Sequence, residues 1–539
     1  MRKEGPGSAA LSEWWRPATP QAPRRPERRV DEGTRLEEDH ARPAESGRDP
    51  RAAAPRPEDR RPAGRTLAAR PSARAPVPSW SGAADRPAWA ALPAGAPSWA
   101  ATPPAWAVPS PAWAATRRAA AAAPGGIVPF AALVSFTFVM LLAPQAFLPF
   151  LAPLRPAMLA AAIALGVHAG GNVISGRPIT IVTREVVLLA LLGAWALVTL
   201  PFSLWPGGSV ALLTGIYFKS FALFGLNANL VTTAKRLRAL AWLFALAGVP
   251  LALTALNHAM TGQLMGHENE AVKRIAGYEA PLTANPNDLA LTLNLLLPFA
   301  AALAIWSRRP AVKVLLWGVV AFDAIGVVLT YSRGGFLTLM TLAFLLAWHR
   351  LRGNTWAMLL LGPAAAAAAL VLFIAPPSYL RHMETITNYQ ADPTGSAQNR
   401  LSDMITSVQI AVRHPVIGAG LGMNGLALNE ARSRPAWKMV HDVYLQYAVD
   451  LGLLGLGIFG ALFYSSLQSA RRATHGPHGP PGSEEHFVQE CSRAILFALI
   501  AFGVAAIFHP VAYHFYFFGM AGLAVAAARV SQGSPNAAS

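Results

Sequence analysis

The chain has few charged residues and a single cysteine, and each scarcity excludes a class of protein. Charged residues make up 14% of its 539 residues and hydrophobic residues 53%, which is too apolar for an ordinary soluble protein. The lone Cys491 excludes a disulfide framework and a cysteine-based zinc site. No Gly-Lys-Ser/Thr follows the alternate glycines of 418–422, so they do not predict a nucleotide site. No carboxylate joins His509 and His514 at ligand spacing, so no metal site is predicted there.

The net charge of +17 does not indicate nucleic-acid binding, because of where the basic residues lie. Many are in the first 125 residues, which are rich in Arg, Pro and Ala and lack apolar periodicity. Such a composition buries too little apolar surface to offset ordering entropy, so we predict a disordered tail. The tail is too long for a signal peptide. Its repeated tryptophans, as in Pro104-Ala-Trp106-Ala, either reach lipid headgroups or belong to a low-complexity linker or translated upstream sequence.

Long apolar runs begin at Ile127 and continue almost to the end of the chain. Each is roughly long enough to cross a bilayer as a helix. The twelve runs lie near 127–145, 151–169, 186–203, 209–231, 238–258, 287–306, 312–331, 335–349, 356–375, 441–467, 490–509 and 512–529.

Basic residues alternate between the loops that join these runs. With the tail in the cytoplasm, the loops expected inside carry Arg177, Arg184, Lys235, Arg236, Arg238, Arg308, Arg309, Lys313, Arg350, Arg352, Arg471, Arg472 and Arg529. The short loops expected outside, 201–209 and 509–512, carry no Lys or Arg. This agreement with the positive-inside rule predicts that both ends are cytoplasmic and that the long polar segment before His441 is outside.

The predicted fold class is an all-α polytopic membrane protein with about twelve transmembrane helices, one large extracytoplasmic helical loop and a disordered N-terminal tail. The expected parts are a cytoplasmic tail (1–125), nine transmembrane helices (126–375), a large periplasmic loop (376–440), three further helices (441–529) and a cytoplasmic C-terminal tail (530–539).

The stretch 400–455 is the one long polar segment within this apolar body. Its first part predicts a helix that ends at Pro415, because four apolar residues share one helical face: Leu401, Ile405, Val408 and Val412. His441 stands where the next membrane helix begins, and its near-neutral pKa suits a general base. With arginines nearby, the segment suggests chemistry on an anionic substrate at a membrane surface.

Each candidate side chain also has a simpler interpretation. Arg333, beside two glycines at the outer end of a run, either binds phosphate through its planar fork or extends to the headgroups. Arg400 and Arg413 are either ligand contacts or ordinary charges on a solvated helix. His441 is either a base or a capping or packing residue. Asn287 or Asp288 is a candidate cap for the sixth run.

Four motifs stand in order along the apolar body. They are Asn285-Pro-Asn287-Asp288-Leu-Ala; Ser332-Arg333-Gly334-Gly335-Phe-Leu; Arg400 followed by His414-Pro415-Val-Ile-Gly418-Ala-Gly420; and His441-Asp442-Val-Tyr-Leu445 ahead of Asp450-Leu-Gly452-Leu-Leu-Gly455. Together they resemble the O-antigen ligase and polymerase superfamily, and the first is similar to that of members handling exopolysaccharide. The resemblance covers about residues 127–529.

The resemblance implies a metal-independent inverting glycosyltransferase without a cofactor in the bacterial inner membrane. Its active site would be periplasmic. It would transfer a glycan from undecaprenyl diphosphate to a hydroxyl of a growing polysaccharide or of lipid A core, with membrane lipid and no nucleic acid as partner. By motif, Arg333 would hold the diphosphate, Arg400 or Arg413 would contact it from the loop, and His441 would activate the acceptor. Arg274 is a weaker candidate for donor binding. The family often has Asn where this chain has Asp442.

A polytopic transporter or lipid-linked glycan flippase is the alternative from another class. Lys219 and Asp323, which are ionisable groups in apolar runs, would form a proton relay in a transporter; otherwise they pair or lie near helix ends. The gathering of polar candidates on one side favours an enzyme. Polymerase, ligase and protein-glycosylating ligase stay open, because the motifs do not identify the acceptor.

Overall fold

The computed structural model describes residues 126–262, 264–265, 274–275, 285–351, 396–432 and 438–533. This part of the chain is helical apart from one short antiparallel pair of strands, β1 (Leu264–Met265) and β2 (Arg274–Ile275). The α-helices are α2 (Ile127–Leu142), α3 (Pro156–Ile174), α4 (Arg184–Thr199), α5 (Pro206–Leu212), α6 (Phe218–Leu230), α7 (Ala234–Thr261), α8 (Pro286–Trp306), α9 (Pro310–Leu329), α10 (Arg333–Leu351), α14 (Ser396–Arg413), α15 (Asn424–Ala431), α16 (Val443–Thr474), α17 (Glu484–Ala505) and α18 (Phe515–Gln532). Short 3₁₀ helices are η4 (Pro144–Ala146), η5 (Pro149–Leu154) and η6 (Leu200–Phe202), and η7 (Leu213–Tyr217) is a π-helix.

The described helices make the chain a multi-pass membrane protein. In the described part of the chain, eight helical segments are long and apolar enough to cross a bilayer, and α2 is a shorter apolar helix. Every predicted run that the structure describes contains a helix, which confirms the all-helical fold class. The run 356–375, the tail 1–125 and parts of the loop 376–440 lie outside the described residues, so the count of twelve stays a prediction.

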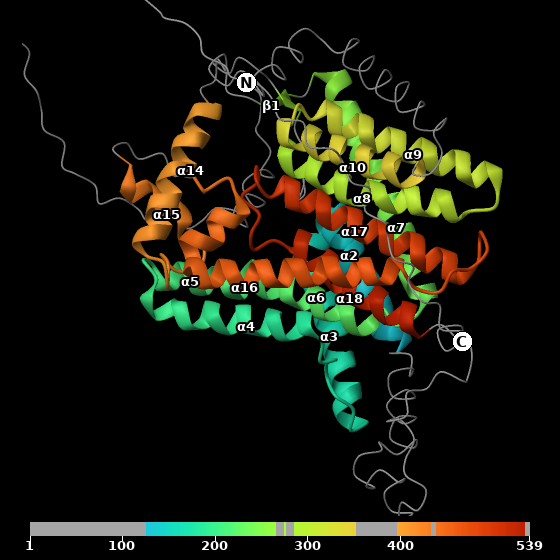
Figure 1. The fold of residues 1–539 in the computed structure, drawn as a ribbon, viewed down its shortest axis with the longest axis horizontal. Coiled ribbons are helices and arrows are strands. Elements are labelled where there is room, and N and C mark those ends of the chain that lie inside the picture. Colours follow the sequence, from blue (N-terminus) through green and yellow to red (C-terminus); the bar gives the residue numbers. More distant parts are fainter. Residues whose placement is uncertain are drawn as a thin grey trace, which may run out of the picture. The chain divides into compact units, whose positions relative to one another are not determined.

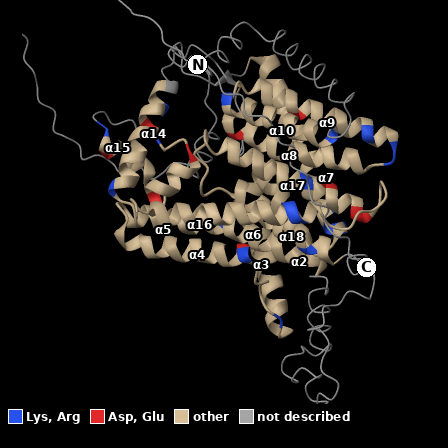
Figure 2. Cartoon of the chain, viewed as in Figure 1, with Lys and Arg blue, Asp and Glu red and all other residues tan. Residues whose placement is uncertain are grey.

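The helices differ in how deeply they are buried. In the most apolar 18-residue stretch of α8, 89% of the residues are buried. The corresponding share is 22% in α9 and 6% in the segment formed by η5 and α3. Helix α8 contacts α7, α9, α10 and α17, and Figure 1 shows it between α10 and α17. A helix that is apolar on all sides is expected in such an interior position, whereas most residues of α3 and α9 are not buried within the protein. Figure 2 shows that charged residues are sparse along the helix bodies.

Helix α16 is interrupted at Gly452, which has a positive φ of 69°. Such a break leaves backbone groups that lipid cannot satisfy. The segment before it in the chain pairs with these groups: the amides of Ala419 and Gly420 donate to the carbonyls of Val449 (2.7 Å) and Asp450 (2.9 Å). In return, the amide of Leu453, next to the break, donates to the carbonyl of Pro415 (2.7 Å).

Glycine permits this close approach of two backbone segments. Gly418, Gly420 and Gly422 have φ values of 74°, 102° and 76°, which are costly for other residues. A Cβ at Gly420 would lie 2.2 Å from Oγ of Ser203, and one at Gly452 would lie 2.1 Å from the carbonyl oxygen of Val416. The alternate glycines therefore dock the polar segment onto the broken helix.

The predicted helix within the polar segment is present as α14, at the same end of α16 as α15 (Figure 1). Its four apolar residues share one face, as predicted, but that face is exposed: Leu401, Ile405, Val408 and Val412 are each about half exposed or more. The helix instead buries the face that contains Asp403, Ser407, Ile410 and Ala411. Periodicity thus identified the helix but not the face that packs against the protein.

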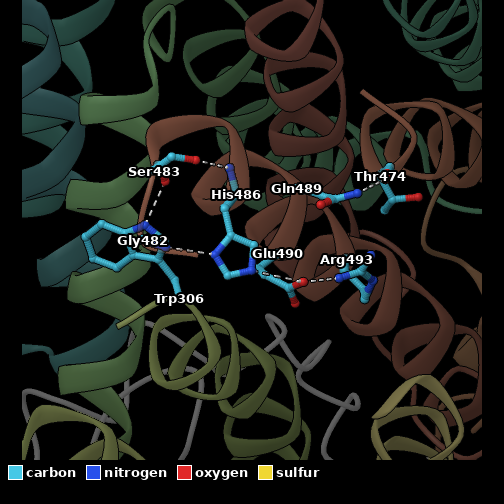
Figure 3. A network of polar contacts seen from close by, with 8 residues as sticks. All are labelled: Trp306, Thr474, Gly482, Ser483, His486, Gln489, Glu490 and Arg493. Atoms are coloured by element: carbon cyan, nitrogen blue, oxygen red, sulfur yellow. Dashed lines mark hydrogen bonds and ion pairs between the residues drawn. The ribbon is translucent and has the colours of Figure 1, made fainter. Parts of the chain in front are cut away.

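A polar network at the other end of α16 joins three helices (Figure 3). The side chain of Ser483 caps α17, and its carbonyl accepts a hydrogen bond from Nε1 of Trp306 at the end of α8 (2.8 Å). The side chain of Gln489 donates to the carbonyl of Thr474 at the end of α16 (3.0 Å). Glu490 accepts from Arg493 in the same network. These contacts fix the turn between α16 and α17.

The close approach at Gly452 predicts a large cost for Gly452→Ala. The added Cβ would collide with a backbone carbonyl at a positive φ, so the free energy of unfolding is expected to fall by about 3 kcal/mol. Gly457→Ala in the same helix is the matched control, because a Cβ there has no neighbour within 4 Å. Cys491 is buried, so its reaction with a thiol-specific dye during heating reports unfolding. Equal unfolding temperatures for the two variants would contradict the prediction.

Candidate functional site

His441 lies just before α16, in a segment held by hydrogen bonds on both sides. On one side, the amide of Val440 donates to Oδ1 of Asn424 (3.0 Å). On the other, Asp442 caps α16 by accepting from the amide of Leu445 (2.8 Å). Nδ1 of His441 lies 2.8 Å from the carbonyl oxygen of Met439. Because a carbonyl only accepts, Nδ1 carries the hydrogen, and in the neutral ring Nε2 offers the lone pair.

A buried carboxylate anchors this segment to the broken helix. Oδ2 of Asp450 accepts from Nδ2 of Asn424 (2.8 Å) and from the hydroxyl of Tyr513 (2.7 Å). Asp450 is fully buried. Asn424 therefore connects the carboxylate on α16 to the backbone beside His441, so the histidine is positioned by contacts between segments that are distant in sequence.

The surroundings of His441 keep its ring neutral. Burial is the main cause that lowers its pKa to about 4, and the charge of Arg400 lowers it further. His509 acts in the same direction. The hydrogen bond to Met439 and the charge of Asp403 act in the opposite direction but do not offset burial. At neutral pH the imidazole is therefore uncharged and can accept a proton.

The two loop arginines lie at different ends of α14. Arg400 is partly buried in the first turns, close enough to His441 to affect its pKa. Arg413 is exposed and is the last residue of the helix. Thirteen residues of helix separate them by about 20 Å, so the two cannot contact the same diphosphate from this helix. Arg400 is therefore the loop arginine that lies near His441, and Arg413 lies at the far end of the helix from it.

Arg333 begins α10 at a closely packed junction with α8 and the 508–509 segment. The hydroxyl of Ser332 donates to Oδ1 of Asn287 (2.8 Å) and accepts from the amide of Gly335 (3.1 Å). A Cβ on Gly334 would lie 3.4 Å from Cε1 of His509. The backbone beside Arg333 is therefore next to His509, which in turn affects the pKa of His441.

Arg274 lies in β2, where its Cα pairs with Met265 of β1, but its side chain is outside the described residues. Its role in donor binding stays a prediction. The sequence interpretation also missed a role for Asn424 and for Asp450. An acidic residue inside an apolar run was the available signal for Asp450, because such a residue is costly unless it is paired.

The two ionisable groups considered for transport lie in different surroundings. Asp323 of α9 is fully buried, with its carboxylate against Gly248 of α7. Lys219 of α6 lies within electrostatic range of Arg155. Neither is among the residues that surround His441. In the described part of the chain, no three His, Cys, Asp or Glu side chains are grouped to hold a metal ion.

The fold and the site define a multi-pass membrane protein in which a polar helical segment, docked on a broken membrane helix, holds a neutral histidine beside arginine. Residues 318–460 match the family model described as O-antigen ligase. This confirms the resemblance inferred from the motifs over a stretch that includes Arg333, Arg400, Arg413 and His441, and it supports a glycosyltransferase-type membrane enzyme, a glycan ligase or polymerase.

No curated protein matches the chain. Among solved structures, one chain comes from work on the structural coordination of polymerization and crosslinking by a peptidoglycan synthase complex. It is 20% identical, with 65% of this chain and 98% of that chain covered and a TM-score of 0.36. A TM-score of this size does not establish a common fold.

The lowered pKa of His441 predicts the pH range in which its ring becomes protonated. The ring is expected to stay neutral until the pH approaches 4, whereas an unperturbed histidine titrates near 6.5. Since the folded pKa is below the unfolded one, the resulting stability is present above about pH 6.5 and is lost as the pH falls toward 4. The measurement is NMR of ring-labelled histidine in the purified protein. Arg400→Gln should raise the pKa and Arg413→Gln should not; half-protonation of the wild-type ring near 6.5 would refute the assignment.

Proposed function

We propose that the chain is an inverting O-antigen or exopolysaccharide polymerase or ligase. It transfers a glycan from undecaprenyl diphosphate to an acceptor sugar hydroxyl at the periplasmic face of the bacterial inner membrane. The observation that carries the proposal is a neutral His441, with Nδ1 bound to a backbone carbonyl and Arg400 close by. The O-antigen ligase match over 318–460 supports the same reaction class.

In the proposed step, Nε2 of His441 takes the proton of the acceptor hydroxyl. The hydroxyl oxygen bonds to the anomeric carbon as the bond from that carbon to the diphosphate oxygen breaks. The electron pair of the broken bond leaves with the diphosphate, whose negative charge Arg333 and Arg400 stabilise. Guanidinium groups suit this role because they make paired, charge-assisted hydrogen bonds and stay charged. The leaving group is already activated, so these charges supply the stabilisation without requiring a metal ion.

A pKa of about 4 makes His441 a weak base in the empty site. Burial is the main cause of this low pKa, and an anionic diphosphate bound beside Arg400 would offset the part that comes from positive charge. The pKa of His441 would then rise toward the operating pH, where a general base is most effective. The donor thus prepares the base for the acceptor. Asp442 has a separate role in capping α16, which Asn performs equally well, so the difference from the family's usual Asn keeps this cap.

A transporter or flippase is the second candidate, and Asp323 is the observation that favours it. Its carboxylate oxygens are buried without a hydrogen-bond partner among the described residues. Asp323 lies against Gly248 of α7 and is not among the groups that shift the pKa of His441, so the enzyme is preferred. Polymerase and ligase differ in acceptor: a growing polysaccharide or lipid A core. Arg274 is proposed only as an additional donor contact.

Removing the base is the most direct test of the enzyme. His441→Ala should reduce glycan transfer by about 10²- to 10⁴-fold, the contribution expected of a general base. The lipid-linked donor should accumulate while protein level and unfolding temperature stay unchanged. Transfer at near the wild-type rate would show that His441 is not the general base. It would also remove most of the reason to prefer an enzyme over a transporter.

The two loop arginines form a matched pair for testing the donor site. Arg400→Ala should reduce transfer by about 10²-fold, because a stabiliser of developing charge is lost. Arg413→Ala should change transfer by less than about twofold, as expected of an exposed surface charge. Arg333→Lys should also be strongly impaired, because lysine keeps the charge but loses the planar fork. Equal losses in the two alanine variants would reverse the assignment of Arg400.

The proposed topology has its own test. Reporter fusions at Gln398 and Thr474 should report opposite sides of the membrane, since the loop 376–440 is proposed to be periplasmic and the basic turn after α16 cytoplasmic. A reporter at Ser483 is the control, because it should agree with Thr474. Reports from the same side for Gln398 and Thr474 would overturn the topology and the periplasmic site.

A further inference from the structure

His509 is a buried histidine whose two ring nitrogens both face acceptors. Only 1% of its surface is exposed. Nδ1 lies 2.9 Å from the carbonyl oxygen of Ala505, and Nε2 lies 3.1 Å from the carbonyl oxygen of Asn287. A carbonyl oxygen cannot donate, and a neutral imidazole has only one N–H. In the neutral ring, one of the two nitrogens would therefore direct its lone pair at a carbonyl oxygen in a site without water. In the imidazolium, both nitrogens carry a hydrogen, so both contacts are hydrogen bonds.

The local field also favours a cation at this position. Ala505 is the last residue of α17, so its carbonyl belongs to the helix end that carries partial negative charge. A protonated histidine just beyond a helix C-terminus is stabilised by that charge. The two charge-assisted hydrogen bonds replace the water that burial removes.

The position of His509 connects it to the proposed donor site. Its Cε1 would lie 3.4 Å from a Cβ on Gly334, the residue after Arg333. The Asn287 that accepts from its ring also accepts from the hydroxyl of Ser332, just before Arg333. His509 therefore packs beneath the start of α10, where the positive end of that helix attracts anions.

From this geometry we infer that His509 is a buried imidazolium that supplies a fixed third positive charge, beside Arg333 and Arg400, to an anion site that takes the diphosphate of the donor. The inference rests on the proposed function. His509 is a positioning residue here, because it acts through the start of α10 and through the local field.

Other ionisable groups lie on the elements that meet near His509 and His441. They are Asp288 on α8, Arg333 on α10, Arg400 on α14, His441 and Asp442 before α16, and His514 before α18. Asp288 accepts from Nδ2 of Asn285, and Asp442 accepts from the amide of Leu445. The carboxylates are thus bound within their own helix caps. A diphosphate placed among the cations would balance their charge.

The protonation state can be measured directly in the wild-type protein. Nitrogen NMR of ring-labelled histidine, in the full chain reconstituted in lipid nanodiscs, distinguishes a ring with two N–H groups from a neutral one. His509 should show two N–H groups at neutral pH, and its signal is assigned by its loss in His509→Gln. A neutral ring with one N–H at neutral pH would overturn the inference, and the protonation state itself is measured in the wild-type protein.

Binding of inorganic pyrophosphate tests the link to the anion site. By calorimetry, His509→Gln should weaken binding about tenfold, as expected for loss of one charge near a desolvated anion. His514→Gln on the same loop is the control and should bind like wild type. The unfolding temperature, read from Cys491, should be similar in the two variants. Wild-type affinity in His509→Gln would overturn the inference.

The same assay separates the inference from the proposed function. If His509→Gln weakens pyrophosphate binding while Arg333→Ala and Arg400→Ala do not, His509 contributes a charge to an anion site, but the proposed role of the two arginines in that site is wrong. If the arginine variants weaken binding and His509→Gln does not, the donor site stands and the inference about His509 is wrong.

Discussion

The interruption of α16 at Gly452 is the constraint on which the site depends. A broken membrane helix exposes amides and carbonyls that lipid cannot satisfy, so another backbone must reach them. The segment from Pro415 to Gly420 does so, and its glycines allow the approach. Asp450 lies beside the same break and accepts a hydrogen bond from Asn424, which in turn accepts one from the backbone beside His441. The position of the histidine therefore depends on the contacts that satisfy the broken helix.

The two ends of the helical core differ in electrostatic character. In the network around Glu490, an acidic group contacts Arg493 and lies near His486, so the charges balance locally. Around His441, the charged neighbours that lower its pKa are Arg400 and His509, and the carboxylate that raises it, Asp403, is paired with Arg432. An end with excess positive charge is suited to an anionic ligand, whereas the balanced end is suited to holding helices together.

The glycines of the family motifs also have distinct physical roles. Those of 418–422 and Gly452 adopt positive φ values where two backbones meet. Gly334 and Gly335 have a different role, since a Cβ on Gly335 would lie 2.5 Å from that of Ala290 in α8. They bring the start of α10 against its neighbours, which places the backbone of Arg333 at the same end as the histidines.

The sequence by itself determined the membrane helices, because twenty apolar residues in a row have one stable solution in a bilayer. It also determined the helix ending before Pro415 and the position of His441 at the start of α16. Only the tertiary structure decided which face of α14 is buried, that α16 is broken, and that Asn424 joins His441 to Asp450. Hydropathy and periodicity describe neighbours along a chain, whereas these contacts join segments brought together by packing, so no local pattern specifies them.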